Sequence, residues 1–335
     1  MSRPAADVSE AVRAAFTPRA VMPFPDWADA NIVLDRGGVR TPWRTSLTPY
    51  LRQPMLDASV ESPVEEIVIM KPSQWGASEC FAVAFPCYMA DVAPCNILEI
   101  QPDLEAAARF SQLRIDPVIA GNPRLRALFV EKKSRDAGNT QHLKTFPGGS
   151  WAILGSNSPA GLSSLPAAVV IFDERDRAAQ SAGVGSRAEG DQYLLAKART
   201  ITFRDTFPRR KLIQLSSPGE TSTSRIEPAW MDSDRRRYHV PCAECGAAIV
   251  FMFVRLWWPR GGDPRTARYR CQSCDKLLDE RDKPEMLERG EWIAERPDRD
   301  VRGYKGTGLD SPFLRWGEMA AERERVKGNP NELRV

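Results

Sequence analysis

The sequence lacks three features that would place it in a special class of proteins. No apolar run approaches the ~18 residues that a helix needs to cross a bilayer. The N-terminal stretch MSRPAADVSEAVRAAF carries acids among its arginines and has no apolar h-region, so we expect no secretory signal. The formal net charge is only +3, so any contact with phosphates must come from local patches. We therefore expect a globular cytoplasmic protein that does not bind membranes.

The sequence also argues against a disulfide-stabilised scaffold. Seven cysteines are few for a chain of 335 residues, and the sequence shows no signal for an oxidising compartment in which disulfides persist. Four of them form two C-x-x-C pairs, Cys242 with Cys245 and Cys271 with Cys274. This spacing predicts a zinc ribbon, in which four thiolates hold a structural Zn²⁺ ion. We expect the remaining cysteines, Cys80, Cys87 and Cys95, to be small core residues.

The stretch VIMKPSQWGASE, residues 68–79, matches a phosphate-binding loop that has lost its lysine. The pattern G-x-x-x-x-G-K-[ST] expects lysine where Ala77 stands and glycine where Lys71 stands. Such a loop curls back on itself, so Lys71 at its start can supply the missing charge. We expect the nucleotide to be bound by Lys71, Ser73, Gln74, Trp75, Gly76, Ala77 and Ser78, with backbone amides of 72–78 on the phosphates and the Ser78 hydroxyl on Mg²⁺.

The pattern of apolar runs predicts an α/β fold with a mostly parallel sheet. Strands are expected at 64–70, 96–102, 166–174 and 211–220, and a hairpin around Pro147-Gly148-Gly149. Helices are expected over 78–92, bent or shortened by Pro86, and from Asp103 onward. In such folds, function gathers at the carboxyl ends of the strands.

Two of these strands end in polar residues suited to nucleotide chemistry. The strand 166–174 ends in Asp173 and Glu174, which fit a Mg²⁺ ligand and an acid that activates water. The strand 211–220 contains Ser216 and Ser217, which fit a sensor of the γ-phosphate. Strand-end acids and Ser-Ser-Pro turns are common without any nucleotide, but their order along the chain favours an ATP site.

The chain resembles the large terminase subunit of tailed bacteriophages, GpA type. That family's loop, Lys-x-x-Gln-x-Gly-x-[Ser/Thr]-Glu, is matched at Lys71, Gln74, Gly76, Ser78 and Glu79. Its acidic motif, Asp-Glu-x-Asp-Arg, is matched at Asp173, Glu174, Asp176 and Arg177, and SSPGETSTSRI resembles its coupling segment. The resemblance implies an ASCE-type P-loop ATPase that moves double-stranded DNA into a procapsid in the bacterial host cytoplasm. It also implies a homo-oligomeric ring, with portal protein and small terminase subunit as partners.

The sequence departs from the family pattern in ways that leave questions open. Gln74 stands where relatives carry an arginine finger, so Arg109, Arg114 and Arg175 are unranked candidates for that charge. Tyr50 and Gln53 are either an adenine contact or, for Tyr50, a buried side chain. The arginine- and aromatic-rich stretches 204–211, 234–239 and 255–270 are either DNA contacts or charged faces over packed aromatics.

The expected organisation is an irregular N-terminal arm at 1–60, a P-loop ATPase domain at 61–230 and a zinc-ribbon and linker region at 231–335. Only about 60 residues follow Cys274, so we expect no C-terminal nuclease domain and no nuclease activity, as in a fragment, split gene or decayed prophage copy. Two alternative functions remain: a helicase-like ATPase, and an inactive prophage remnant or zinc-ribbon nucleic-acid-binding module.

Overall fold

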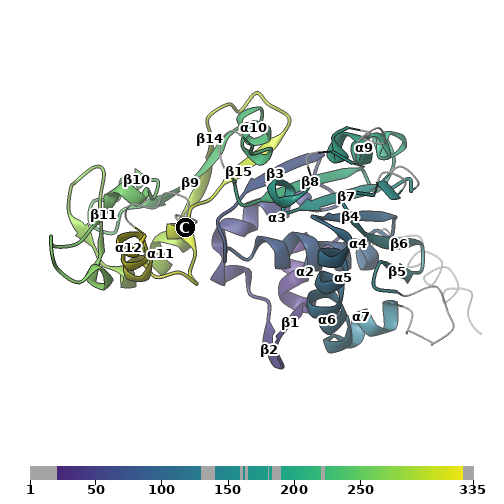
Figure 1. Ribbon diagram of the computed structural model, residues 1–335, viewed down its shortest axis with the longest axis horizontal. Helices are drawn as coiled ribbons and strands as arrows, with labels where there is room; N and C mark the ends of the chain where they lie inside the picture. Colours follow the sequence, from purple (N-terminus) through teal and green to yellow (C-terminus); the bar gives the residue numbers. More distant parts are fainter. Residues whose placement is uncertain are drawn as a thin grey trace, which may run out of the picture.

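The structure is a computed structural model that describes residues 21–129, 140–158, 161–162, 165–179, 181–182, 190–219 and 223–326. Within these residues the main sheet has ten strands, and nine of them lie in the order β10-β9-β15-β3-β8-β7-β4-β6-β5, with β14 paired to β9 (Figure 1). The strands are β3 Glu66–Met70, β4 Ile97–Gln101, β5 Leu143–Phe146, β6 Gly149–Gly155, β7 Val169–Asp173, β8 Lys211–Ser216, β9 Arg236–Pro241, β10 Ala248–Ile249, β14 Glu291–Ala294 and β15 Arg302–Lys305.

The centre of this sheet is parallel, as the sequence predicts. The seven strands β9, β15, β3, β8, β7, β4 and β6 pair parallel in this order, while β5, β10 and β14 pair antiparallel at the margins. All four predicted strands and the predicted hairpin are present, each within a few residues of its expected bounds. The strand β8 lies between β3, which leads into the loop, and β7, which carries the acids.

Helices cover both faces of the sheet, which explains why its central strands are continuous apolar runs. Ile67 and Ile69 of β3 belong to the large core, whereas Val68 and Met70 face Ile226 and Trp230 on the other side. Figure 1 shows α2, α4 and α5 on one face and α9 and α10 on the other. The helices around the sheet are α2 Phe24–Asn31, α4 Phe85–Val92, α5 Leu104–Phe110, α6 Asp116–Gly121, α7 Pro123–Leu128, α9 Gln192–Ala198 and α10 Ile226–Met231. Two short turns, η5 Arg175–Arg177 and η7 Ile201–Phe203, lie between them.

Two of the helices contain a π-helical segment. The helix after the loop begins as η3 (Glu79–Ala84) and continues as α4, and the Phe85 N–H bonds the Cys80 carbonyl, five residues back. Pro86 lies just after this segment and has no N–H to donate. The wider π-helical turn accommodates the missing hydrogen bond without a break in the helix. The second helix starts at Asp103, as predicted; the Asp103 side chain caps it by accepting from the Ala106 N–H, and the helix passes through η4 (Ser111–Ile115).

The described part of the N-terminal segment is more regular than the predicted arm. It contains α2 Phe24–Asn31, the hairpin β1 Val33–Arg36 with β2 Val39–Pro42, the short turns η1 Thr45–Leu47 and η2 Pro49–Leu51, and α3 Arg52–Ala58. Phe24 and Trp27 pack against Tyr88 of α4, so the segment is part of the core. Residues 1–20 of the predicted arm lie outside the described residues.

The C-terminal segment contributes both to the main sheet and to a separate lobe (Figure 1). Strand β15 pairs with β3, so part of the predicted 231–335 region completes the sheet that holds the loop. Besides its strands of the main sheet, the segment contains η8 Phe253–Arg255, β11 Leu256–Trp257, η9 Pro264–Thr266, β12 Arg268–Arg270, β13 Leu277–Leu278, η10 Glu280–Asp282, α11 Lys283–Glu288, η11 Gly308–Asp310 and α12 Trp316–Arg325. Figure 1 shows β10, β11, α11 and α12 in the lobe. In the described part of the chain, no helix has the length and apolarity to span a membrane.

Candidate functional site

Three parallel strands bring the predicted nucleotide residues to one edge of the sheet. Met70 at the end of β3 lies opposite Ser216 of β8, and Leu215 of β8 lies opposite Asp173 of β7. The Lys71 N–H continues this pairing by donating to the Ser216 carbonyl at 3.0 Å. Because neighbouring parallel strands end together, residues 71, 173–174 and 216–217 form one cluster.

The loop from Lys71 to Ser78 has a curled backbone. Gln74 and Gly76 have positive φ angles of 54° and 79°, so the chain turns sharply at both positions. The first bond of the following helix joins the Cys80 N–H to the Gly76 carbonyl at 3.1 Å. The N–H groups of Ala77, Ser78 and Glu79 precede that bond and have no acceptor within the helix, which is the arrangement that favours anions.

The Lys71 side chain points to the acid pair. Its Nζ atom lies 2.6 Å from Oε1 of Glu174, and the lysine side chain is only 7% exposed. Glu174 itself follows β7 with φ 51°, in the left-handed region, and its other oxygen lies 3.3 Å from Nε of Arg177. Lys71 is predicted to supply the positive charge that the loop lacks at Ala77; its amine lies beside the acid pair, and its contact with phosphates stays a prediction.

Ser78 and Asp173 form a second pair beside the first. The Ser78 hydroxyl donates to Oδ1 of Asp173 at 3.1 Å, and the Glu174 N–H donates to the same oxygen at 3.0 Å. Asp173 is 2% exposed, and this burial raises its pKa to about 6, although Lys71 acts to lower the pKa and Glu174 to raise it. A serine hydroxyl and a carboxylate within hydrogen-bond distance are oxygen ligands of the kind that Mg²⁺ prefers.

Ser216 is buried and already has hydrogen-bond partners. Its hydroxyl accepts from the Asp176 N–H and donates to the Ser217 carbonyl, both at 3.0 Å. Ser216 therefore contacts the acidic turn through its side chain and Lys71 through its backbone, and its predicted role as a phosphate sensor stays a prediction. Ser217 follows directly at the end of the strand.

Two loop residues predicted to bind nucleotide have side chains that face the protein core. The Trp75 indole is 1% exposed and stacks on Tyr50 with centroids 4.3 Å apart, and Ala77 is also 1% exposed. Their backbone N–H groups remain the parts that can reach a phosphate. Tyr50 is fully buried and donates to the Trp75 carbonyl at 3.1 Å, and the Ser311 hydroxyl donates to the Gln74 carbonyl at 2.6 Å. Of the two readings of Tyr50, the buried side chain is correct.

The three candidate finger arginines lie in different surroundings. Arg109 pairs with Glu105 on the surface of α5, Arg114 pairs with Glu79 beside Ser78, and Arg175 is buried against Gln214 and Asp191. Sequence reasoning did not include Arg177 among the candidates, yet it is the arginine that contacts Glu174. Its position three residues after Glu174 is the signal that would have identified it.

The four paired cysteines meet in the separate lobe. Their sulfur atoms all lie within 4.8 Å of one another, with Cys242 to Cys274 and Cys245 to Cys271 both at 4.0 Å. A tetrahedral ion with metal–sulfur bonds of about 2.3 Å needs sulfurs roughly 3.8 Å apart, so this cluster fits a metal ion. By contrast, Cys80, Cys87 and Cys95 are buried in the core, and burial raises the pKa of each thiol, as expected for inert cysteines.

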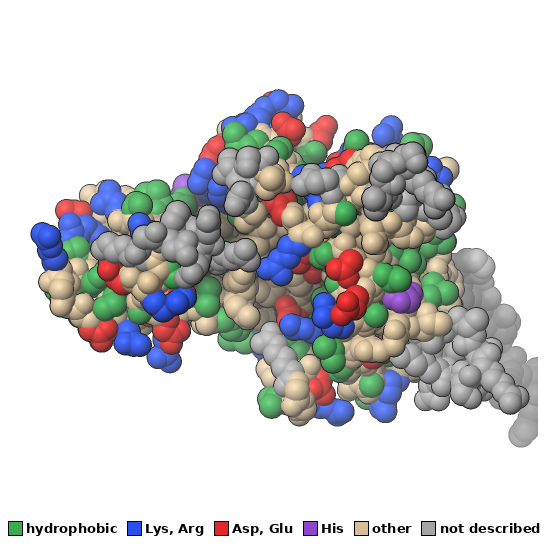
Figure 2. Space-filling view, viewed as in Figure 1, with side chains coloured by type: hydrophobic (Ala, Val, Ile, Leu, Met, Phe, Trp, Pro, Cys, Tyr) green, Lys and Arg blue, Asp and Glu red, His purple; other side chains and the backbone are tan. Residues whose placement is uncertain are grey.

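Several arginines of the arginine-rich stretches form ion pairs with nearby acids. Arg236 pairs with Asp234, and Arg237 pairs with Glu295. In the lobe, Arg255 lies 3.6 Å from Asp275. Figure 2 shows basic and acidic side chains intermingled over the lobe on the face drawn, rather than a field of one sign. DNA contact by these stretches stays a prediction.

Comparison with known proteins identifies the family. The sequence model of the phage terminase large subunit gpA ATPase domain matches residues 37–292, which is most of the chain. The chain therefore belongs to this family, as its loop and acidic motifs predict. No curated protein matches it in sequence.

Two solved terminases are similar in structure at low identity. The large terminase of bacteriophage HK97 has 14% identity and a TM-score of 0.45, covering 63% of this chain and 40% of the terminase. The large terminase of a thermophilic bacteriophage has 16% identity and a TM-score of 0.36, covering 53% of this chain and 40% of that protein. The chain thus spans about two fifths of either terminase.

The raised pKa of Asp173 predicts a gain in stability from Asp173→Asn. The ionised carboxylate destabilises the fold, so this group's contribution to stability is present below its ordinary pKa of 3.8 and lost as pH rises through about 6. Asparagine keeps the acceptor for Ser78 without the charge. At pH 8 the variant should gain up to ~3 kcal/mol in the free energy of unfolding, and at pH 4 the gain should vanish.

Urea unfolding of the free protein at both pH values measures this difference. The exposed Asp26 serves as a control, because Asp26→Asn should change stability by less than about 0.5 kcal/mol at either pH. A loss of stability in Asp173→Asn at pH 8 contradicts the expectation.

Proposed function

We propose that this protein is the ATP-hydrolysing part of a viral DNA-packaging motor that moves double-stranded DNA into a procapsid. The observation that carries the proposal is the meeting of two pairs at one sheet edge, Lys71 with Glu174 and Ser78 with Asp173. Membership of the gpA ATPase family supports the same conclusion. The position of β8 between the loop strand and the acidic strand supports an ASCE-type P-loop ATPase.

Each residue of the cluster has one role in this proposal. Lys71 and the backbone N–H groups of 73–78 bind the phosphates, and Ser78 and Asp173 hold Mg²⁺. The ion, when bound, neutralises charge that develops on the phosphate oxygens. Glu174 orients the attacking water and accepts its proton, while Ser216 and Ser217 respond to the γ-phosphate. Arg177 adds positive charge next to Glu174.

Lys71 has to change partner in this cycle. In the free protein its amine neutralises Glu174, and both side chains are largely buried. Phosphate oxygens entering the loop compete for the same ammonium group, so binding of nucleotide releases the Glu174 carboxylate to act on water. Nucleotide binding and activation of the base are thereby linked through one amine.

The rest of the motor follows from the family. The active assembly is a homo-oligomeric ring at the portal, working with portal protein and the small terminase subunit on double-stranded DNA. The four clustered cysteines bind a structural Zn²⁺ ion and form a zinc ribbon, since all four coordination positions are filled by thiolates.

Glu174→Gln tests the role of the base. Glutamine keeps an oxygen for Lys71 but cannot accept a proton, so ATP hydrolysis should fall roughly 10²–10⁴-fold while ATP binding persists. Phosphate release and binding of a fluorescent ATP analogue measure the two quantities. Glu105→Gln, an exposed acid paired with Arg109, is the control and should hydrolyse ATP normally. Unchanged turnover in Glu174→Gln would remove this assignment.

Lys71→Ala tests the displaced cation. A hydrogen bond from a charged group contributes about 1.5–3 kcal/mol, so affinity for the ATP analogue should fall roughly 10- to 100-fold, and Lys71→Arg should retain part of it. Lys276→Ala, which removes an exposed lysine paired with Glu244, should bind as the wild type does. If Lys71→Ala binds the analogue normally, the cation of the loop lies elsewhere.

Metal analysis tests the cysteine cluster. The purified protein should contain one zinc ion per chain, and Cys245→Ser, at the exposed member of the cluster, should lose it together with thermal stability. Cys95→Ala, outside the cluster, should keep its zinc. Full zinc content in Cys245→Ser would show that the metal is not held by these four sulfurs.

A further inference from the structure

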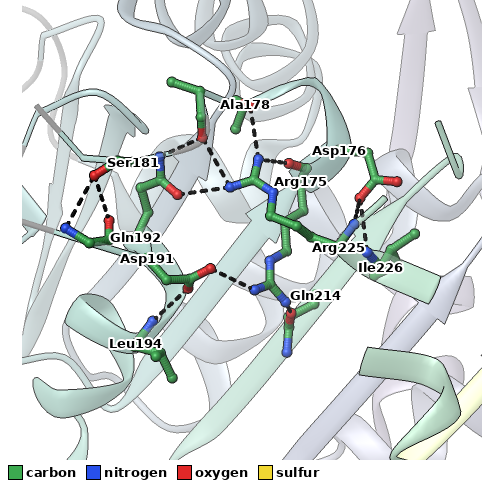
Figure 3. Close-up of polar contacts among 12 residues, drawn as sticks. Arg175, Asp176, Ala178, Ser181, Asp191, Gln192, Leu194, Gln214, Arg225 and Ile226 are labelled. Atoms are coloured by element: carbon green, nitrogen blue, oxygen red, sulfur yellow. Dashed lines mark hydrogen bonds and ion pairs between the residues drawn. The ribbon is translucent and has the colours of Figure 1, made fainter. Parts of the chain in front are cut away.

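The turn that carries Glu174 is held by a polar network that the function described above does not use. This turn runs from Glu174 to Ala179 after β7, and Figure 3 shows it bonded to the segment that precedes α10. Glu174 has a positive φ, an uncommon conformation for a glutamate, and such conformations persist only where their surroundings enforce them. The network shows what enforces it.

Asp176 bonds the segment before α10 through its carboxylate. One oxygen accepts from the N–H groups of Arg225 and Ile226, and the other accepts from Gly219, each at 2.9 Å. Burial acts to raise the pKa of Asp176, but these bonds and one from Ser224 outweigh it and lower the pKa below its ordinary value. The carboxylate thus stays ionised and fixes the start of α10.

Arg225 makes the reciprocal connection. Its guanidinium donates to the carbonyls of Arg175, Ala178 and Ala179, and to Oε1 of Gln192 at 3.0 Å (Figure 3). A lysine cannot reproduce this fork of donors. Asp176 of the turn therefore binds the segment before α10, and Arg225 of that segment binds the turn. We call this pair of contacts the clamp.

The clamp also joins Glu174 to the strand that feeds the loop. Ile226, bonded to Asp176, opens α10, and Ile226 and Trp230 pack against Val68 and Met70 of β3. Met70 is followed directly by Lys71. Thus the two partners of the ion pair, Lys71 and Glu174, are connected a second time through α10.

We infer that Asp176 and Arg225 are positioning residues that hold the backbone of Glu174 in its positive-φ conformation and tie that conformation to helix α10. This inference rests on the proposed ATPase function. Neither residue contacts the ion pair or the Ser78–Asp173 pair in the structure, so each acts through the backbone of the turn. A displacement of α10 consequently moves Glu174, and a change at Glu174 reaches α10.

Asp176→Asn and Arg225→Lys test the clamp through a split between turnover and binding. Each should lower the kcat for ATP at least tenfold, because Glu174 is misplaced, while the Kd for a fluorescent ATP analogue changes less than threefold, because Lys71 and the loop are untouched. The double variant should lose little more than either single variant, since both act on one turn. Additive losses would show two independent effects.

Arg210→Lys is the matched control. Arg210 is a buried arginine paired with Glu65 next to the opposite end of β8, so its replacement should reduce thermal stability without lowering kcat. If Arg210→Lys loses as much turnover as Arg225→Lys, the effect is general destabilisation and the inference is overturned. Normal kcat in Asp176→Asn or Arg225→Lys overturns it as well.

Hydrogen exchange separates failure of the clamp from failure of the proposed function. Arg225→Lys should speed exchange in the peptide covering 175–179, and Asp176→Asn should speed it in the peptide covering 223–231, with or without ATP. Unchanged exchange in both would show that the clamp holds nothing. Absence of ATPase activity in the wild type together with these exchange effects would refute the function and leave the clamp as a structural contact.

Discussion

The parallel pairing of β3, β8 and β7 is the constraint on which the rest of the site depends. Because the three strands end at one edge, residues far apart in the sequence are brought together: Lys71, Ser216 and the Asp173–Glu174 pair. The pairing holds because each strand is buried on both faces, which requires helices on both sides. A slip of one residue in β8 would exchange the faces of its side chains and separate Ser216 from Asp176.

Charge balance is the second constraint at this edge. Lys71 pairs with Glu174 at 2.6 Å and Arg177 lies 3.3 Å from the other Glu174 oxygen, whereas the buried Asp173 carboxylate accepts only from neutral donors, the Ser78 hydroxyl and the Glu174 N–H. The pKa of Asp173 is raised to about 6 by that burial, although Lys71 opposes the effect. In the proposed function, a divalent cation would compensate the buried charge of Asp173, while phosphates would compete for Lys71. Burial of the Asp173 charge thus makes the free site energetically unfavourable, and ligand binding would relieve this cost, as is common at functional sites.

The sequence predicted the parts of the fold that depend on local pattern. The apolar runs gave the central strands, and the motif order gave the cluster of Lys71, Ser78, Asp173 and Glu174. It did not predict β15 or the regular N-terminal helices, because these elements are short and their faces are defined only by what they pack against. The motif predicted that Trp75 belongs to the loop site. It did not predict that the Trp75 indole faces the core, which leaves only the backbone to face the loop. The bonds between Asp176 and Arg225 join distant segments, so no local pattern reveals them.

The loop is shaped by residues outside the predicted ATPase segment, which ties its conformation to the C-terminal region. Tyr50 stacks on Trp75 from the N-terminal side, and the Trp292 ring packs edge-on against Trp75 at 6.2 Å. Gly306, which follows β15 in the sequence, packs directly against the Trp75 indole, and a Cβ at this position would collide with it. Ser311 then bonds the Gln74 carbonyl. A division of the chain after residue 230 would separate the loop from three of these supports, so the loop conformation belongs to the folded chain as a whole rather than to the motif.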